Sequence, residues 1–154
     1  MSFVAETGYD GVEIAPFTLA PHVTDVPASE RTRLRQEAAE AGIEISGIHW
    51  VLVGTEGMHM TSPDESVRRR TAQYFCDLVD FCADLGGESI IVGSPHQRNL
   101  DDDTPLEIGL DRAREVFRAS LKRAEDKGVT VCFEPLAPSE TNFINTAEEA
   151  ITFV

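Results

Sequence analysis

The amino-acid sequence predicts an α/β fold in which the strands run parallel and are covered by helices. A helix, a glycine and a short apolar strand follow one another repeatedly along the 154 residues. The expected strands are nearly continuous apolar runs, as in parallel sheets that are buried on both faces. The segments between them carry apolar residues at helical spacing. The glycines that precede the strands are Gly8, Gly42, Gly86 and Gly128.

Each glycine is followed by one expected strand. These are YDGVEIAP (9–16), IEISGIHWVLV (43–53), GESIIVGSP (87–95) and VTVCFEPL (129–136). Four strand–helix units of about 40 residues amount to half of a (β/α)8 TIM barrel, which takes ~250 residues. The chain opens on what reads as a helix end and stops early in a new helix at Val154. We therefore expect residues 1–154 to form one partial TIM-barrel domain that lacks the first strand and the C-terminal strands.

Capping patterns mark three of the expected helix starts. Ser62–Glu65, Thr104–Glu107 and Thr146–Glu149 each place a glutamate three residues after a serine or threonine,. A proline at the first helical position strengthens the first two. Apolar stripes then follow two of these starts. The first stripe consists of Val67, Thr71, Phe75, Leu78, Cys82 and Leu85, and the second of Leu106, Leu110, Ala113, Phe117, Leu121 and Ala124.

Composition excludes several classes of partner. The net charge of −14 argues against nucleic acid and against anionic membrane surfaces, both of which require basic side chains,. The N-terminus has no basic segment followed by a long apolar run, so we expect no signal peptide and no membrane span. The cysteines Cys76, Cys82 and Cys132 lack CxxC spacing, which favours a reducing, cytoplasmic location,.

The strongest functional signal is Glu134, which ends the last expected strand. In an alternating strand, Thr130, Cys132 and Glu134 share one face, while Val131 and Phe133 lie on the other,. A glutamate on the inner face at the strand's end must be paired, protonated or bound to a metal, because an isolated buried charge is costly. We expect a site there, the alternative being an ordinary salt bridge in the loop.

Other residues near strand ends are candidates for binding a substrate. His49 either lines the mouth of the barrel or is a hydrogen-bonded barrel histidine,. Trp50 is either a platform on which a sugar ring stacks or part of the core. His96 either contacts substrate or is a solvated loop residue. Glu13 ends the first expected strand, and its side chain either faces the mouth of the barrel or points away from it.

Several segments together resemble a known superfamily. GYDGVEIAP, GIHW, IIVGSP, FEPL and INTAEEA look like the sugar isomerase/epimerase superfamily of xylose isomerase-like TIM barrels, which includes the ketose 3-epimerases and, more distantly, endonuclease IV. The resemblance implies an enzyme that acts on a small sugar or sugar phosphate. It implies that Glu134 is a ligand of a divalent metal and an acid/base. It also implies that Glu140 contacts substrate, although glutamates are common in such polar loops.

The implied chemistry removes a proton next to a carbonyl. A divalent ion stabilises the enediolate and a carboxylate moves the proton, and hard oxygen ligands select Mn²⁺ or Mg²⁺. The superfamily's other metal ligands, an Asp, a His and a Glu, come from later strands that this chain lacks. We therefore expect the chain alone to be inactive.

Two other functions remain open. A half-barrel has open strand edges, so the chain is alternatively a non-enzymatic binding module that forms a homo-oligomer. An endonuclease IV-like nuclease is disfavoured by the acidic charge. It is also disfavoured by Gly93–Pro95, which stands where that nuclease carries a histidine.

Overall fold

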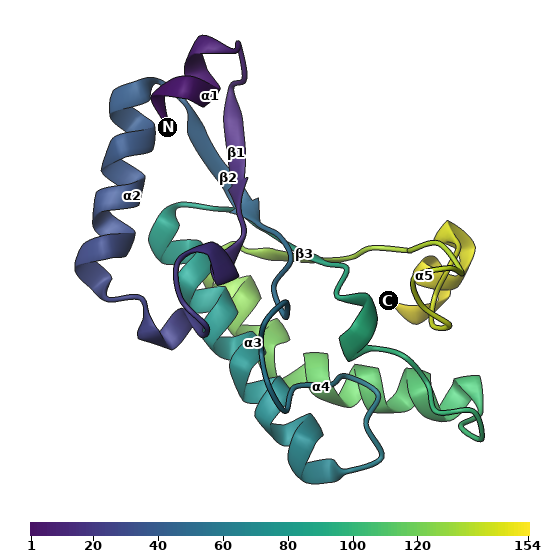
Figure 1. Ribbon diagram of the computed structural model, residues 1–154. Coiled ribbons are helices and arrows are strands. Elements are labelled where there is room, and N and C mark those ends of the chain that lie inside the picture. Colours follow the sequence, from purple (N-terminus) through teal and green to yellow (C-terminus); the bar gives the residue numbers. More distant parts are fainter.

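Four parallel strands form the sheet in a computed structural model that describes residues 1–154 (Figure 1). The strands lie side by side in the order of the sequence, and each neighbouring pair is parallel. This confirms the predicted arrangement of strand–helix units, one half of a TIM barrel. The strands are β1 (Gly11–Ile14), β2 (Glu44–Ile48), β3 (Ser89–Val92) and β4 (Thr130–Phe133).

Helices connect the strands and cover the sheet. The two long helices, α3 and α4, pack along each other beneath it, while α2 lies beside α3 (Figure 1). Gly42, Gly86 and Gly128 end α2, α3 and α4 in the left-handed conformation, where a residue with a Cβ is strained,. No helix has the length and apolar character needed to cross a membrane. The helices are α1 (Ser2–Glu6), α2 (Ala28–Ala41), α3 (Glu65–Leu85), α4 (Leu106–Lys127) and α5 (Ala147–Phe153).

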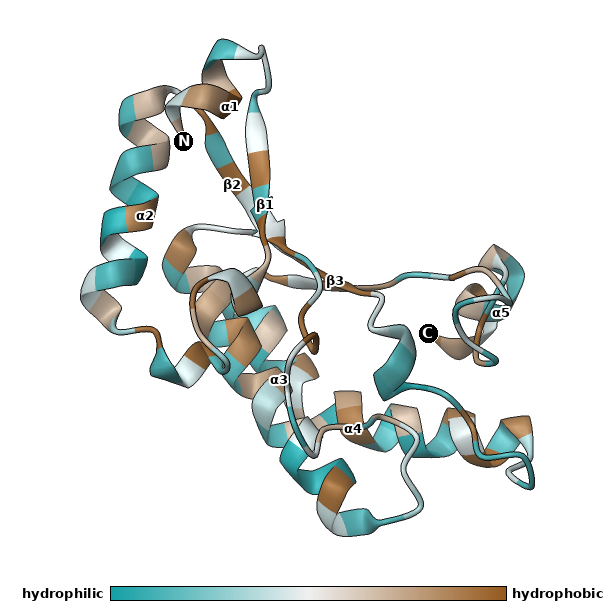
Figure 2. Cartoon of the chain, viewed as in Figure 1, coloured by the Kyte–Doolittle hydropathy of each residue, from teal (hydrophilic) through white to brown (hydrophobic).

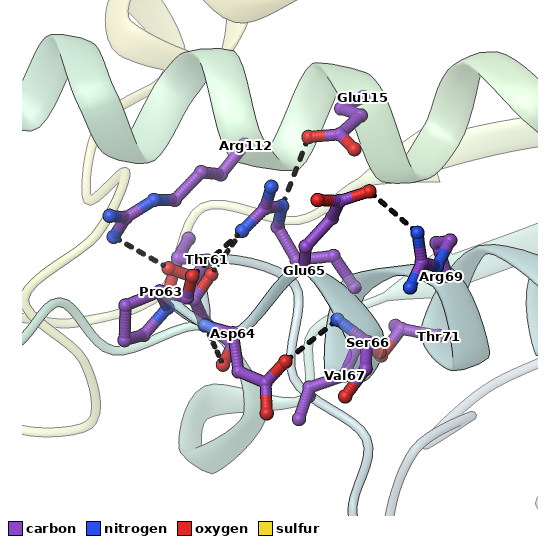
Figure 3. Close-up of polar contacts among 12 residues, drawn as sticks. Thr61, Pro63, Asp64, Glu65, Ser66, Val67, Arg69, Thr71, Arg112 and Glu115 are labelled. Atoms are coloured by element: carbon purple, nitrogen blue, oxygen red, sulfur yellow. Dashed lines mark hydrogen bonds and ion pairs between the residues drawn. The ribbon is translucent and has the colours of Figure 1, made fainter.

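The start of α3 differs from the prediction (Figure 3). Asp64 is the N-cap, and its Oδ1 accepts a hydrogen bond from the backbone N–H of Ser66 at 2.7 Å. The hydroxyl of Ser62 instead accepts from the backbone N–H of Asp64 at 3.2 Å. The predicted box at Ser62–Glu65 is therefore wrong. An aspartate one residue before the helix caps it directly, and the serine only stabilises the preceding turn.

The two remaining capping patterns have opposite outcomes. Helix α4 begins at Leu106 after Pro105 with no side-chain cap, so the predicted box at Thr104–Glu107 is wrong. Proline has a fixed φ and no N–H, and here it precedes the helix instead of occupying its first turn. The box at Thr146–Glu149 is confirmed, because the hydroxyl and the glutamate bond each other's backbone N–H groups at the start of α5.

Apolar side chains from both long helices build one core against the sheet (Figure 2). Phe75, Leu78 and Cys82 of the predicted α3 stripe are fully buried. On α4 the stripe is only partly buried: Leu110, Ala113, Phe117 and Ala124 are inside, whereas Leu106 and Leu121 are 45% and 53% exposed. Leu121 borders an apolar hollow of about 300 Å³ beside β4. Strand β4 has no neighbour beyond it, which leaves this side of α4 uncovered.

Two strand predictions also need correction. The second apolar run was expected to continue to Val53, but β2 ends at Ile48. Val51 and Leu52 are buried in the turn that follows, so their apolar character reflects packing and not strand structure. The last strand begins at Thr130 and is less buried than predicted, since an edge strand of an open half-barrel has neighbours on one side only.

Candidate active site

The carboxyl ends of the parallel strands bring three titratable side chains together. Glu13 lies in β1, His49 directly follows β2, and Glu134 directly follows β4. Parallel strands present the same end at the same edge of the sheet, so these residues converge although they are far apart in sequence. The pairing of β1 with β2 shifts register between Val12 and Glu13. Such a bulge changes the direction in which the next side chain points.

The imidazole of His49 bridges the two carboxylates. Its Nδ1 lies 3.3 Å from Oε2 of Glu13, and its Nε2 lies 3.4 Å from Oε2 of Glu134. The side chains of His49, Glu13 and Glu134 are 28%, 38% and 37% exposed, respectively, so a ligand can reach the cluster from solvent. Nε2 and Glu134 are within hydrogen-bond distance, with the proton's place set by the tautomer of the ring, whereas Glu13 is a charged neighbour of Nδ1,. The ring is therefore placed to exchange a proton with Glu134 and to be oriented by Glu13.

Two residues hold Glu134 in place. The carboxylate lies against Gly93, where a Cβ would approach Oε2 to 2.6 Å. The backbone carbonyl of Glu134 accepts a hydrogen bond from Nη1 of Arg98 at 2.7 Å. Neither contact is predictable from local sequence. Gly93 is a small residue in a loop, and a buried arginine in the polar segment SPHQR (94–98) leaves no pattern that distinguishes it from a solvated one.

A cavity of about 490 Å³ opens beside this cluster. It is formed by the segments that follow β2, β3 and β4, in agreement with the general location of TIM-barrel sites,. Five of the six predicted site residues line it, and Glu13 contacts it only through His49. The five are His49, Trp50, His96, Glu134 and Glu140.

Trp50 forms an exposed wall of this cavity. Its residue is 54% exposed, so the alternative that Trp50 belongs to the core is wrong. Its ring stacks on Phe17 with centroids 5.9 Å apart and planes 26° apart. Trp50 also has a φ of 58°, a conformation that is strained for a residue other than glycine,. Phe17 was not predicted as a site residue, because it follows β1 in a separate loop and nothing in the sequence pairs it with Trp50.

Glu140 and His96 lie at the edge of the cavity. The carboxylate of Glu140 accepts a hydrogen bond from the backbone N–H of Ala137 at 3.2 Å, which stabilises its own loop. His96 is exposed on the short 3₁₀ helix Pro95–Gln97 after β3. Both side chains line the cavity and are exposed to solvent, so a ligand in the cavity could reach them. No contact within the protein shows what they bind.

The chain's own residues do not complete a metal site. No three or more His, Cys, Asp or Glu side chains are grouped so as to hold an ion. Glu134 offers hard carboxylate oxygens of the type that Mg²⁺ and Mn²⁺ prefer, but its Oε2 faces His49,. Glu134 therefore fits the role of one ligand, and a full coordination shell needs donors from outside these residues.

The known proteins that this chain resembles include D-psicose 3-epimerases. The chain is 26% identical over 153 residues to a D-psicose 3-epimerase of Agrobacterium fabrum and 29% identical over 157 residues to that of Ruminiclostridium cellulolyticum. Each match covers 98% of this chain and 50% of the relative. A crystal structure of D-psicose 3-epimerase with D-fructose superposes with a TM-score of 0.82 at 23% identity, over 99% of this chain and 51% of its own.

The chain thus spans about half the length of the relatives it matches. The family model described as the xylose isomerase-like TIM barrel matches residues 1–154 in full. The resemblance inferred from the sequence motifs is confirmed, and the chain belongs to the xylose isomerase-like TIM barrel family.

Proposed function

We propose that the protein containing this chain is a divalent-metal-dependent sugar or sugar-phosphate isomerase or epimerase. The observation that carries the proposal is His49 held between Glu13 and Glu134 at the edge of an open cavity. Epimerisation next to a carbonyl requires a group that removes a proton and a group that returns one. Glu134, in contact with the imidazole of His49, supplies the first of these, and the names of the related epimerases agree with this chemistry.

Glu134 is the proposed proton carrier. Its carboxylate faces the cavity and takes the proton from the carbon next to the substrate carbonyl, which leaves an enediolate. His49 shares that proton through Nε2, and Glu13 holds the ring through Nδ1. Delivery of a proton to the same carbon from the opposite face gives epimerisation and needs a second donor on that face, beyond Glu134 and His49, whereas transfer to the neighbouring carbon gives isomerisation.

Glu134 is also proposed as one ligand of Mn²⁺ or Mg²⁺. When bound, such an ion stabilises the negative charge of the enediolate oxygens. Because the grouped donors needed for a complete shell are absent from residues 1–154, we expect these residues alone to have no epimerase activity. A cytoplasmic location is proposed on the absence of CxxC spacing among the three cysteines, which are free,.

Trp50, Glu140 and His96 are proposed to bind the sugar. The exposed indole offers an apolar face for the C–H groups of the substrate, and the two polar side chains, which line the same cavity, reach its hydroxyls,. The substrate is a small sugar or sugar phosphate, with no nucleic acid or membrane partner.

Deuterium incorporation tests the reaction directly. The full-length gene product is incubated with ketohexoses and Mn²⁺ in D₂O, and the exchange at the carbon next to the carbonyl is followed by NMR. Glu134→Gln is expected to lower the exchange rate by more than about a hundredfold, while the exposed Glu125→Gln on α4 retains it. Exchange at the wild-type rate in Glu134→Gln would overturn the catalytic assignment. If calorimetric titration gave wild type and Glu134→Gln the same affinity for Mn²⁺, the assignment of Glu134 as a metal ligand would be overturned.

A second candidate function is a half-barrel module that binds a partner through its open edges. The observation that favours it is the uncovered side of β4, where Leu121 and the neighbouring apolar side chains are exposed. Such an edge pairs readily with another chain, a second copy included. Sedimentation of residues 1–154 distinguishes this function from the enzymatic one. A stable soluble monomer contradicts the proposal of a partner-binding module, and a discrete oligomer supports it.

A further inference from the structure

The loop after β3 places an arginine entirely inside the protein. Arg98 is 0% exposed, the largest fully buried side chain of the chain. Its guanidinium forms no ion pair, and its Nε is buried without a hydrogen-bond partner. Burial lowers the pKa of Arg98 to about 10, against the opposing effect of the charges of Glu134 and Glu140. The group still carries its charge at neutral pH, in a place where a charge is costly.

The contacts of Arg98 converge on the end of β4 that carries Glu134. Nη1 donates to the carbonyl of Glu134 at 2.7 Å, and Nη2 donates to the carbonyl of Ile144 at 3.3 Å. The guanidinium lies over the ring of Phe133 at 4.8 Å from its centroid. One planar group therefore joins the last strand residue, the proposed catalytic residue and the far end of the loop that carries Glu140.

The other side of Arg98 is tied to the remaining loops around the cavity. Its carbonyl accepts a hydrogen bond from the hydroxyl of Thr61 at 3.1 Å, in the segment after β2. Next to it, Oδ1 of Asn99 accepts from the hydroxyl of Thr141 at 2.8 Å, in the segment after β4. Residues 98 and 99 thus connect all three segments that line the cavity. Ile144, which Arg98 bonds, has a strained φ of 58° that needs such support,.

We propose that Arg98 is a positioning residue of the active site, holding the backbone of Glu134 so that its carboxylate meets His49. The kinetic consequence rests on the proposed function, whereas the effect on the Glu134–His49 contact does not. A displacement of about 1 Å in a catalytic group lowers a rate by about a hundredfold. A lysine keeps the charge of Arg98 but cannot bond two carbonyls in one plane while stacking on Phe133.

The chain offers a matched control in Arg114. This arginine also donates to two backbone carbonyls, those of Phe153 and Thr152, and lies over the Phe153 ring at 5.8 Å. It lies on α4 away from the cavity that contains Glu134. Its side chain is 37% exposed and also pairs with Asp111, so its loss reports the effect of removing a carbonyl-bonding arginine away from the site, whereas the melting temperature reports the added effect of burial at Arg98.

The test compares Arg98→Lys, Arg98→Met and Arg114→Met in the full-length protein. Melting temperature, kcat and KM for a ketohexose, and the ¹⁵N shifts of the His49 ring are measured. We expect kcat to fall by about ten- to a hundredfold in both Arg98 variants, with KM within about threefold of wild type. The Nε2 shift of His49 should change in both Arg98 variants. Arg114→Met should change neither kcat nor the Nε2 shift.

Several outcomes would overturn the proposal. One is a folded Arg98→Met with kcat within threefold of wild type. Another is that Arg98→Met and Arg114→Met lower the melting temperature equally and Arg98→Met lowers kcat no more than Arg114→Met does. If Arg98→Met does not fold, Arg98→Lys decides by the same criteria. If the wild-type protein has no epimerase activity, the proposed function fails, and the His49 shift still decides whether Arg98 positions Glu134: an unchanged shift in Arg98→Lys contradicts it.

Discussion

Gly93 lies directly against the carboxylate of Glu134. A Cβ at position 93 would come within 2.6 Å of Oε2, and its next neighbour is Leu136 at 3.8 Å. The atom in the way is the end of a flexible side chain, so the protein can relieve the clash by moving it. Gly93 therefore matters for the position of a functional group and little for the stability of the fold.

Gly93→Ala is expected to separate activity from stability. The methyl group displaces the Glu134 carboxylate from His49, so kcat should fall by about tenfold or more, while the free energy of unfolding changes by less than about 1 kcal/mol. Urea denaturation and steady-state kinetics measure the two. The control is Gly109→Ala, whose methyl group would push aside Leu100 outside the cavity. Wild-type kcat in Gly93→Ala would contradict the proposed position of Glu134.

Glu13→Gln should reduce activity through His49. The carboxylate of Glu13 is the second charged neighbour of the imidazole, beside Glu134, and lies 3.3 Å from Nδ1. An amide orients the ring less strongly, and loss of such a partner typically lowers activity by about tenfold. Kinetics of the variant are compared with those of Glu44→Gln, an exposed glutamate at the opposite end of β2. Equal rates in the two variants would show that Glu13 has no part in the reaction.

Trp50→Leu should weaken substrate binding more than it slows the chemistry. Stacking on an aromatic face contributes ~0.5–1.5 kcal/mol, so KM should rise by about two- to tenfold with kcat nearly unchanged. Phe17→Leu removes the ring that supports Trp50 and should give a smaller rise in the same direction. Phe3, which is 75% exposed on α1, provides the control Phe3→Leu. An unchanged KM in Trp50→Leu would exclude it as a sugar platform.

His59 should make the protein less stable as the pH falls. Burial lowers the pKa of His59, and the charge of Asp101 opposes this only in part. Since the pKa is lower in the folded than in the unfolded state, the unfolded chain takes up the proton first, and stability is lost as the pH drops through 6.5, the usual pKa of histidine, towards the lower pKa of the folded protein,.

Thermal denaturation across this range measures the effect. In His59→Gln the decrease in melting temperature should be smaller than in wild type, while His96→Gln, which removes an exposed histidine, should keep the wild-type dependence. If the melting temperature decreased equally with falling pH in His59→Gln and in wild type, His59 would not be the source of the pH dependence.

Part of the site was predictable because it depends on local order along the chain. A run of apolar residues that ends in Glu134 indicates a strand with a carboxylate at its end, and His49 and Glu13 follow from the same pattern. The distances that make His49 a bridge between them depend on the strand order and on the register shift at Glu13. No local pattern encodes either of these.

Other features could not be decided from the sequence because the same residue type has several environments. Trp50 sits next to buried Val51 and Leu52, yet its positive φ turns it outward onto Phe17. Arg98 stands in a polar loop, where arginine is usually solvated, yet it is fully buried and donates to the carbonyls of Glu134 and Ile144. Ser62 satisfies the capping pattern, but Asp64 is two residues nearer the helix and takes its place.

The sequence by itself determined the α/β class, the strands and their glycine-ended helices, and the carboxylate at the end of β4. Periodicity and helix ends are properties of neighbouring residues, so the chain alone specifies them. Only the tertiary structure decided that Glu13, His49 and Glu134 meet, that Gly93 makes room for a carboxylate, and that Arg98 is buried behind it. These contacts join residues from different strands and loops, and they exist only once the parallel strands have aligned their carboxyl ends at one edge of the sheet.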